Sequence, residues 1–307
     1  MSLVSMLSPN GKNGFGAGTT AEEVTAQLDL KGKTILVTGC NSGLGQEAMR
    51  VLALRGARVL GTARSVQKAK EACDAVKGDT VPLACELADP ASVRACAKAV
   101  HDLGVRLDAI ICNAGIMALP KLEQAHGYEL QFFTNHIGHF ILVTNLLDVL
   151  ADDGRVVMLS SGAHRQAPKG GIEFDNLSGE RAYGAWKMYG QSKMANILFA
   201  KELATRFKGT KKTASAVHPG VIPTNLSRHM NPIAKTVFGW IQPLVLKTVP
   251  QGAATEVYAA VHPSLATDSG HYFADCNVAS TRAEANDPAI AKRLWDVSEQ
   301  IVAGLKS

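Results

Sequence analysis

The residues with the clearest chemical potential are Tyr189 and Lys193, which begin and end a pentapeptide with Gly-Gln-Ser between them. Residues four apart lie on the same face of a helix, one turn from each other. A phenol normally titrates near pH ~10, and a neighbouring ammonium group favours its charged form. The spacing therefore predicts an acid–base pair that moves a proton at neutral pH. A solvated helical face would show the same spacing, so a cofactor and a partner for the substrate oxygen must be sought elsewhere in the chain.

Short apolar strands alternate with longer helical segments from Lys33 onward, and these elements must position the pair. We expect strands at 34–37, 58–63, 81–85, 107–112, 154–159, 213–217 and near 271–273. This alternation predicts an α/β fold, a single doubly wound Rossmann-type domain with a parallel sheet of about seven strands flanked by helices. The domain spans residues 31–307. Residues 1–30 form an N-terminal extension, in which 10–18 are Gly-rich and expected to be flexible and 20–23 form a capping box that opens a short helix.

Composition excludes several classes of protein. The chain is 46% hydrophobic and 19% charged, as expected of a soluble globular protein, and its net charge of +5 comes from scattered basic residues that do not predict a nucleic-acid surface. No Cys/His/Asp/Glu cluster accompanies His136 and His139, so we predict no metal site. The sequence shows no secretory signal, and no apolar run reaches the ~18 residues of a membrane anchor.

A Gly-rich turn at 38–45 follows the first strand and opens the first helix. Glycines allow positive φ and close backbone approach, and a helix N-terminus presents free N–H groups to a pyrophosphate. The glycine spacing differs from G-x-G-x-x-G, but the strand before and the helix after place the turn where a dinucleotide needs it. The candidate cofactor-binding residues here are Gly39, Asn41, Ser42, Gly43, Leu44 and Gly45.

The end of the second strand predicts which nicotinamide cofactor is bound. An acidic residue there would bind the adenosine ribose and prefer NAD(H). This position holds Ala63 followed by Arg64, whose guanidinium suits a 2′-phosphate, so NADP(H) is preferred over NAD(H). A solvated surface Arg is the alternative reading. Glu86 and Leu87 follow the third strand, where the adenine is expected to lie.

Polar residues also follow the later strands, at the sheet edge where ligands bind in such folds. Ser160 and Ser161 end the fifth strand, where a hydroxyl can polarise a substrate carbonyl, and the absence of G-x-S-x-G disfavours a serine hydrolase. Asn135 within a helix predicts a local kink or a water site, because its amide competes for backbone groups. The other cofactor candidates at this edge are Asn113, Ala114 and Gly115 after the fourth strand and Pro219, Gly220, Ile222 and Thr224 after the sixth.

Residues 225–250 are the most irregular part of the domain. Apolar residues there are interrupted by Pro232, Pro243 and Pro250. This composition predicts a mobile lid over a lipophilic pocket, while ordinary packing or a partner-facing surface would show the same apolar content.

Together these motifs resemble the short-chain dehydrogenase/reductase family over nearly the whole chain. The family motifs are Thr38-Gly39-x-x-x-Gly43-x-Gly45, Asn113-Ala114-Gly115, Asn135, Ser161, Tyr189-x-x-x-Lys193 and Pro219-Gly220. A finer set is Gln131-Phe132-x-x-Asn135-His136-x-Gly138-His139-Phe140, Ser160-Ser161-x-Ala163-His164, Gly270-x-Tyr272-Phe273-x-Asp275-Cys276 and Lys292-Arg293-Leu294-Trp295, which resembles the retinol dehydrogenase-like branch. A third set is Gly14-Phe15, Thr20-Ala21-Glu22, Val24-Thr25 and Ala182-Tyr183-x-x-Trp186-x-x-Tyr189-Gly190-Gln191-Ser192-Lys193. By this set the chain is, within that branch, most similar to plant and algal proteins related to the dehydrogenase of the chloroplast inner-envelope translocon.

The resemblance implies roles for the catalytic residues. Tyr189 gives its proton to the substrate carbonyl in reduction or takes the hydroxyl proton in oxidation, and Ser161 holds the substrate oxygen. Lys193 lowers the pKa of Tyr189 and binds the nicotinamide ribose, and Asn135 orders a water for proton relay. Glu86 stands where the family usually has Asp, and the N-terminal membrane anchor of animal retinol dehydrogenases is absent.

The resemblance also implies an activity. We expect an NADP(H)-dependent oxidoreductase that acts on a small lipophilic aldehyde, ketone, alcohol or retinoid-like carbonyl, as a homodimer, in the cytoplasm or in association with plastids. The alternative is an NADP(H)-binding redox sensor or scaffold within a larger assembly, with little turnover. Light-dependent pigment reduction on the same fold is a third hypothesis.

Overall fold

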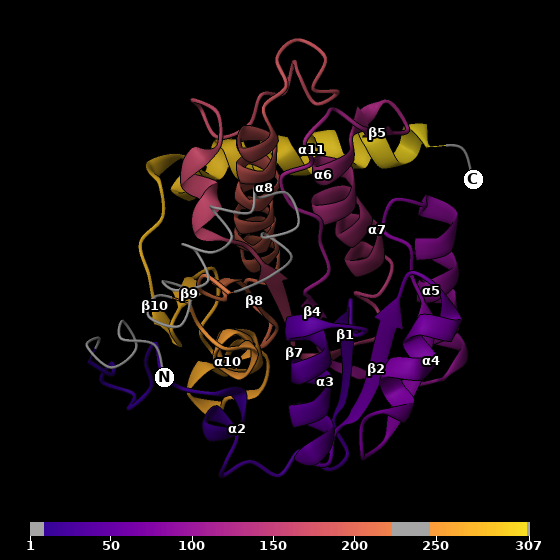
Figure 1. Cartoon of the computed structure of the whole chain (residues 1–307), viewed down its shortest axis with the longest axis vertical. Coiled ribbons are helices and arrows are strands. Elements are labelled where there is room, and N and C mark those ends of the chain that lie inside the picture. Colours follow the sequence, from indigo (N-terminus) through magenta and orange to yellow (C-terminus); the bar gives the residue numbers. More distant parts are fainter. Residues whose placement is uncertain (1–8, 223–245, 306–307) are drawn as a thin grey trace, which may run out of the picture.

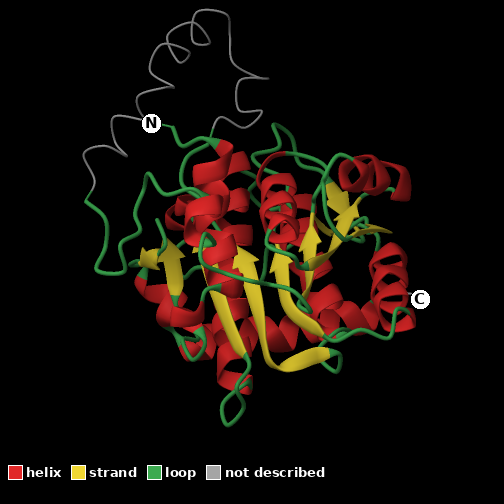
Figure 2. Ribbon diagram, turned by 90° about the horizontal axis from the view of Figure 1, so that it is seen from below, coloured by secondary structure: helices red, strands yellow, loops and turns green. Residues whose placement is uncertain are grey.

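The computed structural model describes residues 9–222 and 246–305. Its centre is an eight-stranded sheet with the order β10-β9-β8-β7-β4-β1-β2-β3, and Figure 2 shows the strands between layers of helices. All neighbouring strands are parallel except β9 and β10. The strands are β1 (Thr34–Thr38), β2 (Arg58–Ala63), β3 (Thr80–Ala84), β4 (Leu107–Cys112), β7 (Leu150–Leu159), β8 (Thr213–His218), β9 (Tyr272–Ala274) and β10 (Asn277–Val278).

Helices cover both faces of the sheet and bury a separate apolar cluster on each (Figure 1). One face carries α2 (Ala21–Val24), α3 (Gly43–Leu54), α4 (Val66–Asp74) and α10 (Val249–Val261). The other carries α5 (Pro90–Asp102), α6 (Leu130–Phe132), α7 (Gly138–Thr144), α8 (Ala185–Arg206) and α11 (Pro288–Gly304). Alternate residues of a strand point to opposite faces, so Val156 and Met158 of β7 join the cluster under α8 while Val157 and Leu159 join that under α10.

The predicted α/β fold and its strands are confirmed, with shifts at their ends. β7 begins at Leu150, four residues before the predicted start, because it pairs with the beginning of β4. Two short elements were not predicted, β10 and the hairpin of β5 (Gln124–Ala125) with β6 (Tyr128–Glu129). Strands of two residues have no hydrophobic period, so a sequence pattern does not reveal them.

The N-terminal extension confirms one prediction and corrects another. Thr20 and Glu23 form the predicted capping box at the start of α2, which packs against α10. The segment 10–18, which we expected to be flexible, is instead held to the domain. Nδ2 of Asn13 donates to the carbonyl oxygen of Cys276 at 2.8 Å, and the Phe15 ring packs edge-on against Tyr258. Glycine content alone does not show such long-range contacts.

The helix that carries Asn135 is irregular, as predicted. α6 continues into a π-helical turn at Phe133–Ile137 before α7 begins. Such wide turns appear mostly as single insertions in α-helices, often at functional sites.

Most of the predicted lid, 225–245, and Thr224 lie outside the described residues. The described residues of that range, 246–250, pack against the domain and begin a helix. Leu246 is buried, Thr248 forms a capping box with Gln251, and α10 begins at Val249, so the last two residues of the predicted loop belong to a helix. No helix in the described parts of the chain combines the length and apolarity that crossing a bilayer requires.

Candidate active site

Tyr189 lies on α8 with only 8% of its surface exposed, facing the end of β7. Close packing of the helix brings it there: a side chain at Gly190 would lie 2.6 Å from the carbonyl oxygen of Ala163, so glycine lets α8 approach the 3-10 turn Gly162–Gln166. Burial raises the pKa of Tyr189 to about 12, although a hydrogen bond with the Ser161 side chain opposes this rise. At neutral pH the phenol is therefore protonated and able to donate.

The structure distinguishes the two serines at the end of β7. Ser160 is buried, and its hydroxyl donates to the carbonyl oxygen of Lys193 at 2.8 Å, which ties the strand to α8. Ser161 is partly exposed, and its hydroxyl accepts from the N–H of Ala163 at 3.1 Å and interacts with Tyr189. The two hydroxyls of Ser161 and Tyr189 thus form the pair available to a substrate oxygen.

Lys193 is buried beside this pair. Its Nζ donates to the carbonyl oxygen of Leu159 at 3.0 Å and lies 5.7 Å from the centre of the Tyr189 ring. Burial lowers the pKa of Lys193 to about 8. The resemblance implies that Lys193 lowers the pKa of Tyr189, but the net shift is upward because desolvation of the phenol dominates. Nζ of Lys193 is directed at a strand carbonyl. A Cβ on Gly115 would lie 2.9 Å from Oδ1 of Asn135 and 3.4 Å from Nζ of Lys193, so glycine leaves room for both side chains.

Asn135 is fully buried and joins three parts of the site. Its Oδ1 accepts from the N–H of Ile116 at 2.8 Å, and its Nδ2 donates to the carbonyl oxygen of Ile116 and to Oγ of Ser192, each at 2.9 Å. Ser192 in turn donates to the carbonyl oxygen of Tyr189 at 2.8 Å. The amide therefore positions the catalytic helix relative to the end of β4.

A chain of hydrogen bonds through His139 connects this helix to the cofactor turn. Nδ1 of His139 lies 2.9 Å from the carbonyl oxygen of Asn135, and Nε2 lies 2.9 Å from Oγ1 of Thr38. A carbonyl only accepts, so Nδ1 carries the proton and Nε2 accepts from Thr38. Burial lowers the pKa of His139 to about 4, which keeps the ring neutral. His136 and His139 are both buried. Nothing in the sequence pattern indicated the link from His139 to Thr38.

The motif after β4 holds the Gly-rich turn in shape. Nδ2 of Asn113 donates to the carbonyl oxygen of Thr38 at 2.8 Å, and the N–H of Ala114 donates to Oγ1 of Thr38 at 3.0 Å. A side chain on Gly45 would lie 2.4 Å from both the Asn113 amide and the Gly39 carbonyl oxygen. Asn113, Ala114 and Gly45 therefore fix the shape of the Gly-rich turn.

The start of α3 fits the pyrophosphate of a dinucleotide. The side chain of Ser42, the N-cap residue, does not bond to the first turn, which leaves helix N–H groups for an anion. Asn41, Ser42 and Gly43 are exposed, and a Cβ at Gly43 would meet open space although its φ of 58° favours glycine. When bound, the nicotinamide group of such a cofactor supplies or accepts the hydride.

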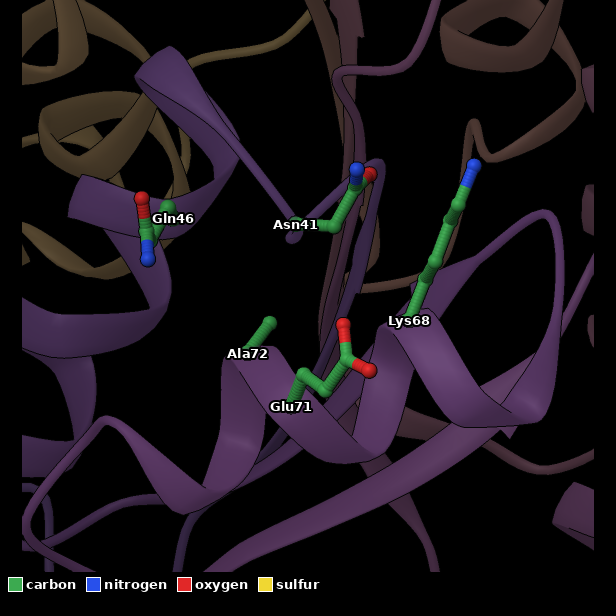
Figure 3. Close-up of a pocket in the computed structure, with 5 residues that line it drawn as sticks. All are labelled: Asn41, Gln46, Lys68, Glu71 and Ala72. Atoms are coloured by element: carbon green, nitrogen blue, oxygen red, sulfur yellow. The ribbon is translucent and has the colours of Figure 1, made fainter.

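A hollow lies between this turn and α4. A cavity of about 300 Å³ is lined by Asn41, Gln46, Lys68, Glu71 and Ala72. In Figure 3, Lys68 and Glu71 rise from α4 toward the turn that carries Asn41. Arg64 is exposed at the end of β2, and Lys68 is a basic residue near it.

Glu86 and Leu87, which we predicted to lie near the adenine, are held by contacts within the protein. Glu86 is partly buried, and its side chain accepts from the N–H of Ala88 at 3.3 Å. Leu87 is buried, and its carbonyl oxygen would lie 2.4 Å from a Cβ on Gly138.

The segment after β8 closes the same edge of the sheet. A Cβ on Gly252 would lie 2.4 Å from Cδ1 of Ile222 and 2.7 Å from Cδ2 of Leu44. The Pro219-Gly220 segment and the cofactor turn therefore meet at α10. The buried Lys247, whose Nζ lies 2.5 Å from Oδ1 of Asp275, packs against Gly220. This ion pair was not anticipated, because its two members are far apart in the sequence.

The arrangement joins a proton donor, a hydroxyl for the substrate oxygen and a dinucleotide turn at one sheet edge. Within residues 9–222 and 246–305, no three His, Cys, Asp or Glu side chains gather as metal ligands would. The site therefore has the parts of a hydride-transfer enzyme in which protein groups handle the proton.

The chain belongs to the short chain dehydrogenase family, whose profile matches residues 33–234. It is 39% identical to the short-chain dehydrogenase TIC 32 A, chloroplastic, of Brassica napus, with 96% of each chain covered. It is 37% identical to human retinol dehydrogenase 14, with 90% of this chain and 88% of the relative covered. A solved structure of a putative uncharacterized protein from Mycobacterium paratuberculosis superposes with a TM-score of 0.76 at 32% identity, covering 93% of this chain and 98% of that one. The protein is therefore an oxidoreductase of this family.

Proposed function

We propose that this protein transfers hydride between NADP(H) and a lipophilic carbonyl or alcohol. The observation that carries the proposal is the pair of hydroxyls from Tyr189 and Ser161, which lies beside buried Lys193 at the same sheet edge as the Gly-rich turn. This geometry supplies both a proton and a hydrogen bond to one substrate oxygen.

In carbonyl reduction, the Tyr189 hydroxyl donates its proton to the substrate oxygen while Ser161 donates a hydrogen bond to the same atom. The raised pKa of Tyr189 keeps this proton in place at neutral pH until the oxygen gains negative charge. In alcohol oxidation Tyr189 accepts the hydroxyl proton instead, and the charge on Lys193 favours the resulting phenolate. Exclusion of water around these buried groups strengthens each interaction.

Preference for NADP(H) rests on Arg64. It is exposed at the end of β2, where an acidic residue would select NAD(H), and Lys68 adds a second positive charge beside the cavity. A 2′-phosphate would be held there by charge-assisted hydrogen bonds.

A lipophilic substrate is supported by an apolar side chain left exposed beside the hydroxyl pair. Trp186 is 43% exposed and packs edge-on against Tyr189, with 6.0 Å between ring centres. Such surface favours an apolar substrate body.

Two further proposals concern the setting of the enzyme. Similarity to a relative named chloroplastic supports association with plastids. A homodimer through the helices of Asn135 and Tyr189, as the resemblance implies, would include α11, because Trp295 of α11 stacks on Phe199 of α8. Figure 1 shows α11 crossing the end of α8.

The test measures NADPH oxidation by the purified protein with aldehydes, ketones, quinones and retinal, and compares it with the Tyr189→Phe variant. We expect turnover in the wild type and a loss of about 10²- to 10⁴-fold in the variant, with NADPH affinity kept. Tight NADPH binding without turnover on any of these substrates would refute the enzyme and favour the sensor or scaffold. Protochlorophyllide under illumination tests the third hypothesis.

A further inference from the structure

Lys247 is a buried cation at the sheet edge where the cofactor is expected, and the mechanism proposed above gives it no part. Its side chain is 9% exposed, and its Nζ lies 2.5 Å from Oδ1 of Asp275. The contact is an ion pair and not a hydrogen bond, since Nζ has no hydrogen-bond partner within residues 9–222 and 246–305. A charge that burial removes from water needs such a partner, so Asp275 decides whether Lys247 keeps this place.

Lys247 holds the segment that follows β8 through its backbone and its side chain. Its N–H donates to the carbonyl oxygen of Val221 at 2.9 Å. Its aliphatic stem covers Gly220, where a Cβ would lie 2.6 Å from Cδ and 3.0 Å from Cε of the lysine. Gly220 also has a φ of 87°, a conformation that favours glycine. The position of the ammonium group therefore determines how the stem lies against this segment.

The segment 219–222 lies on the side of the site where the nicotinamide is expected. In the sheet, β4, β7 and β8 lie on one side of β1, while β2 and the Arg64 that follows it lie on the other. A dinucleotide with its pyrophosphate at the start of α3 and its adenosine toward Arg64 would extend its nicotinamide toward β8. His218 ties this end of β8 to the hydroxyl pair, because its Nδ1 accepts from the N–H of Gly162, the residue after Ser161.

The turn that carries Asp275 has a strained backbone. Asp275 and Cys276 join β9 to β10 with φ values of 53° and 58°, in the left-handed region. Two-residue hairpin turns of this kind favour Asp or Asn followed by Gly, so Cys276 stands where glycine is usual. The N–H of Cys276 donates to Oγ1 of Thr255 at 3.2 Å, and Nδ2 of Asn277 donates to the carbonyl oxygen of Asp275 at 2.7 Å. Strain of this kind persists where surrounding contacts impose it, often at functional sites. Here it holds Asp275 against Lys247.

We propose that Lys247 and Asp275 are a positioning pair for the nicotinamide half of the cofactor: Asp275 anchors the ammonium group, and the lysine stem then holds Gly220 and Val221 in the shape that receives the nicotinamide. This role rests on the proposed function, because it needs a nicotinamide cofactor at this edge. Neither residue touches the reacting atoms. The adenosine half, expected near Arg64, does not depend on the pair.

The experiment uses calorimetry to measure the Kd of NADPH and that of 2′,5′-ADP, which carries the adenosine and the 2′-phosphate but no nicotinamide. Asp275→Asn removes the charge and keeps the turn, because Asn tolerates the left-handed conformation. The buried ammonium group of Lys247 then lacks its partner and turns toward water, which draws the stem away from Gly220. We expect the Kd of NADPH to rise about 10-fold or more, while that of 2′,5′-ADP stays within about twofold of the wild type.

Lys247→Met tests whether the two residues act as a pair. Methionine keeps an apolar stem over Gly220 and removes the charge that needed a partner. Asp275 is then left with a side chain that is 45% exposed and can be solvated, so this variant should bind NADPH more tightly than Asp275→Asn does. The double variant should bind NADPH as Lys247→Met does, which recovers part of the loss in Asp275→Asn. Losses that add in the double variant would overturn the pair.

The ratio of the two Kd values separates positioning from a purely structural role. A variant that is partly unfolded loses affinity for both ligands in the same proportion, so its ratio stays at the wild-type value. Asp108→Asn is the matched control, because Asp108 pairs with Lys33 at 2.8 Å near the start of β4, at the opposite edge of the sheet. This variant should keep the wild-type ratio.

The outcomes also separate this inference from the proposed function. A wild-type ratio in Asp275→Asn would overturn the positioning role and leave the proposed function intact. A wild-type protein that binds 2′,5′-ADP and NADPH equally tightly gains nothing from the nicotinamide half, which would overturn the positioning role whether or not the enzyme is active. A wild-type protein that binds neither ligand would refute the proposed function and this inference with it.

Discussion

Nζ of Lys193 donates a 3.0 Å hydrogen bond to the carbonyl oxygen of Leu159, and Nδ2 of Asn196 donates to the same oxygen, also at 3.0 Å. The end of β7, and not the phenol, therefore fixes the direction of the lysine side chain. The ammonium group is held over the strand edge beside Gly115, where the nicotinamide ribose of a bound cofactor is expected. The catalytic lysine is thus preorganised by the backbone of the sheet.

Lys193→Met should separate stability from activity. Burial lowers the pKa of Lys193 from 10.5 to about 8. Below pH 8 the folded protein therefore holds a buried ammonium group whose desolvation lowers the free energy of unfolding. Removing this charge recovers up to about 3 kcal/mol, against about 1 kcal/mol for the lost hydrogen bond to Leu159. We expect a Tm at pH 7 at least equal to that of the wild type, with kcat/KM reduced by at least about 10²-fold.

Differential scanning calorimetry and steady-state kinetics on the same preparation check this prediction. A strongly lowered Tm would show that Lys193 serves mainly to hold the fold. The conservative variant Lys193→Arg is the useful comparison, because it keeps the charge but does not fit the same buried space.

Arg64→Ala should weaken NADPH binding far more than NADH binding. A charge-assisted hydrogen bond to a phosphate contributes about 1.5–3 kcal/mol, so KM for NADPH should rise about 10- to 100-fold while KM for NADH changes little. Lys70→Ala is the control, because Lys70 lies on α4 but is paired with Asp74 at 2.6 Å. Equal changes for the two cofactors would refute the assignment of Arg64 to the 2′-phosphate.

The sequence predicted the elements of this fold well because its strands are buried on both faces and read as continuous apolar runs. The residues of β1 are all buried, and the predicted strand there was short by one residue. It predicted the place of Ser161 because parallel strands bring their carboxyl ends to one edge. It predicted Tyr189 and Lys193 as neighbours because residues four apart share one face of a helix.

The sequence could not predict contacts between side chains that are distant along the chain. Nothing in the neighbourhood of His139 indicates that Thr38 is its partner. The direction of the Tyr189 pKa shift could not be predicted either, because the spacing of Tyr189 and Lys193 does not show how deeply each side chain is buried.

Two glycines of the cofactor turn should respond differently to alanine. At Gly45 a methyl group would lie 2.4 Å from two polar atoms of the turn, so Gly45→Ala should lower the Tm and abolish cofactor binding together. At Gly43 it would meet open space, and the positive φ costs about 1 kcal/mol, so Gly43→Ala should remain folded but bind NADPH more weakly. Fluorescence titration with NADPH and thermal melts distinguish the two. Equal loss of Tm in both variants would contradict this account.

The buried histidines should make the protein sensitive to acid. Burial lowers the pKa of His136 to about 3 and that of His139 to about 4, both below the ordinary 6.5. Below pH 6.5 these histidines become protonated in the unfolded chain but stay neutral in the folded protein. Each one therefore lowers the free energy of unfolding by about 2 kcal/mol by pH 5. Burial raises the pKa of Glu256 to about 8, so this carboxyl group increases the stability of the folded protein as the pH falls over the same range. A comparison at a single histidine is therefore necessary.

His136→Phe provides that comparison. His136 packs among Phe132, Phe140 and Phe199, so an aromatic ring suits the site, although the hydrogen bond to Ser298 is lost. Whatever its stability at pH 7, the variant should lose about 2 kcal/mol less than the wild type between pH 7 and pH 5 in urea unfolding. The same loss in His136→Phe as in the wild type would show that the ring of His136 is protonated in the folded protein.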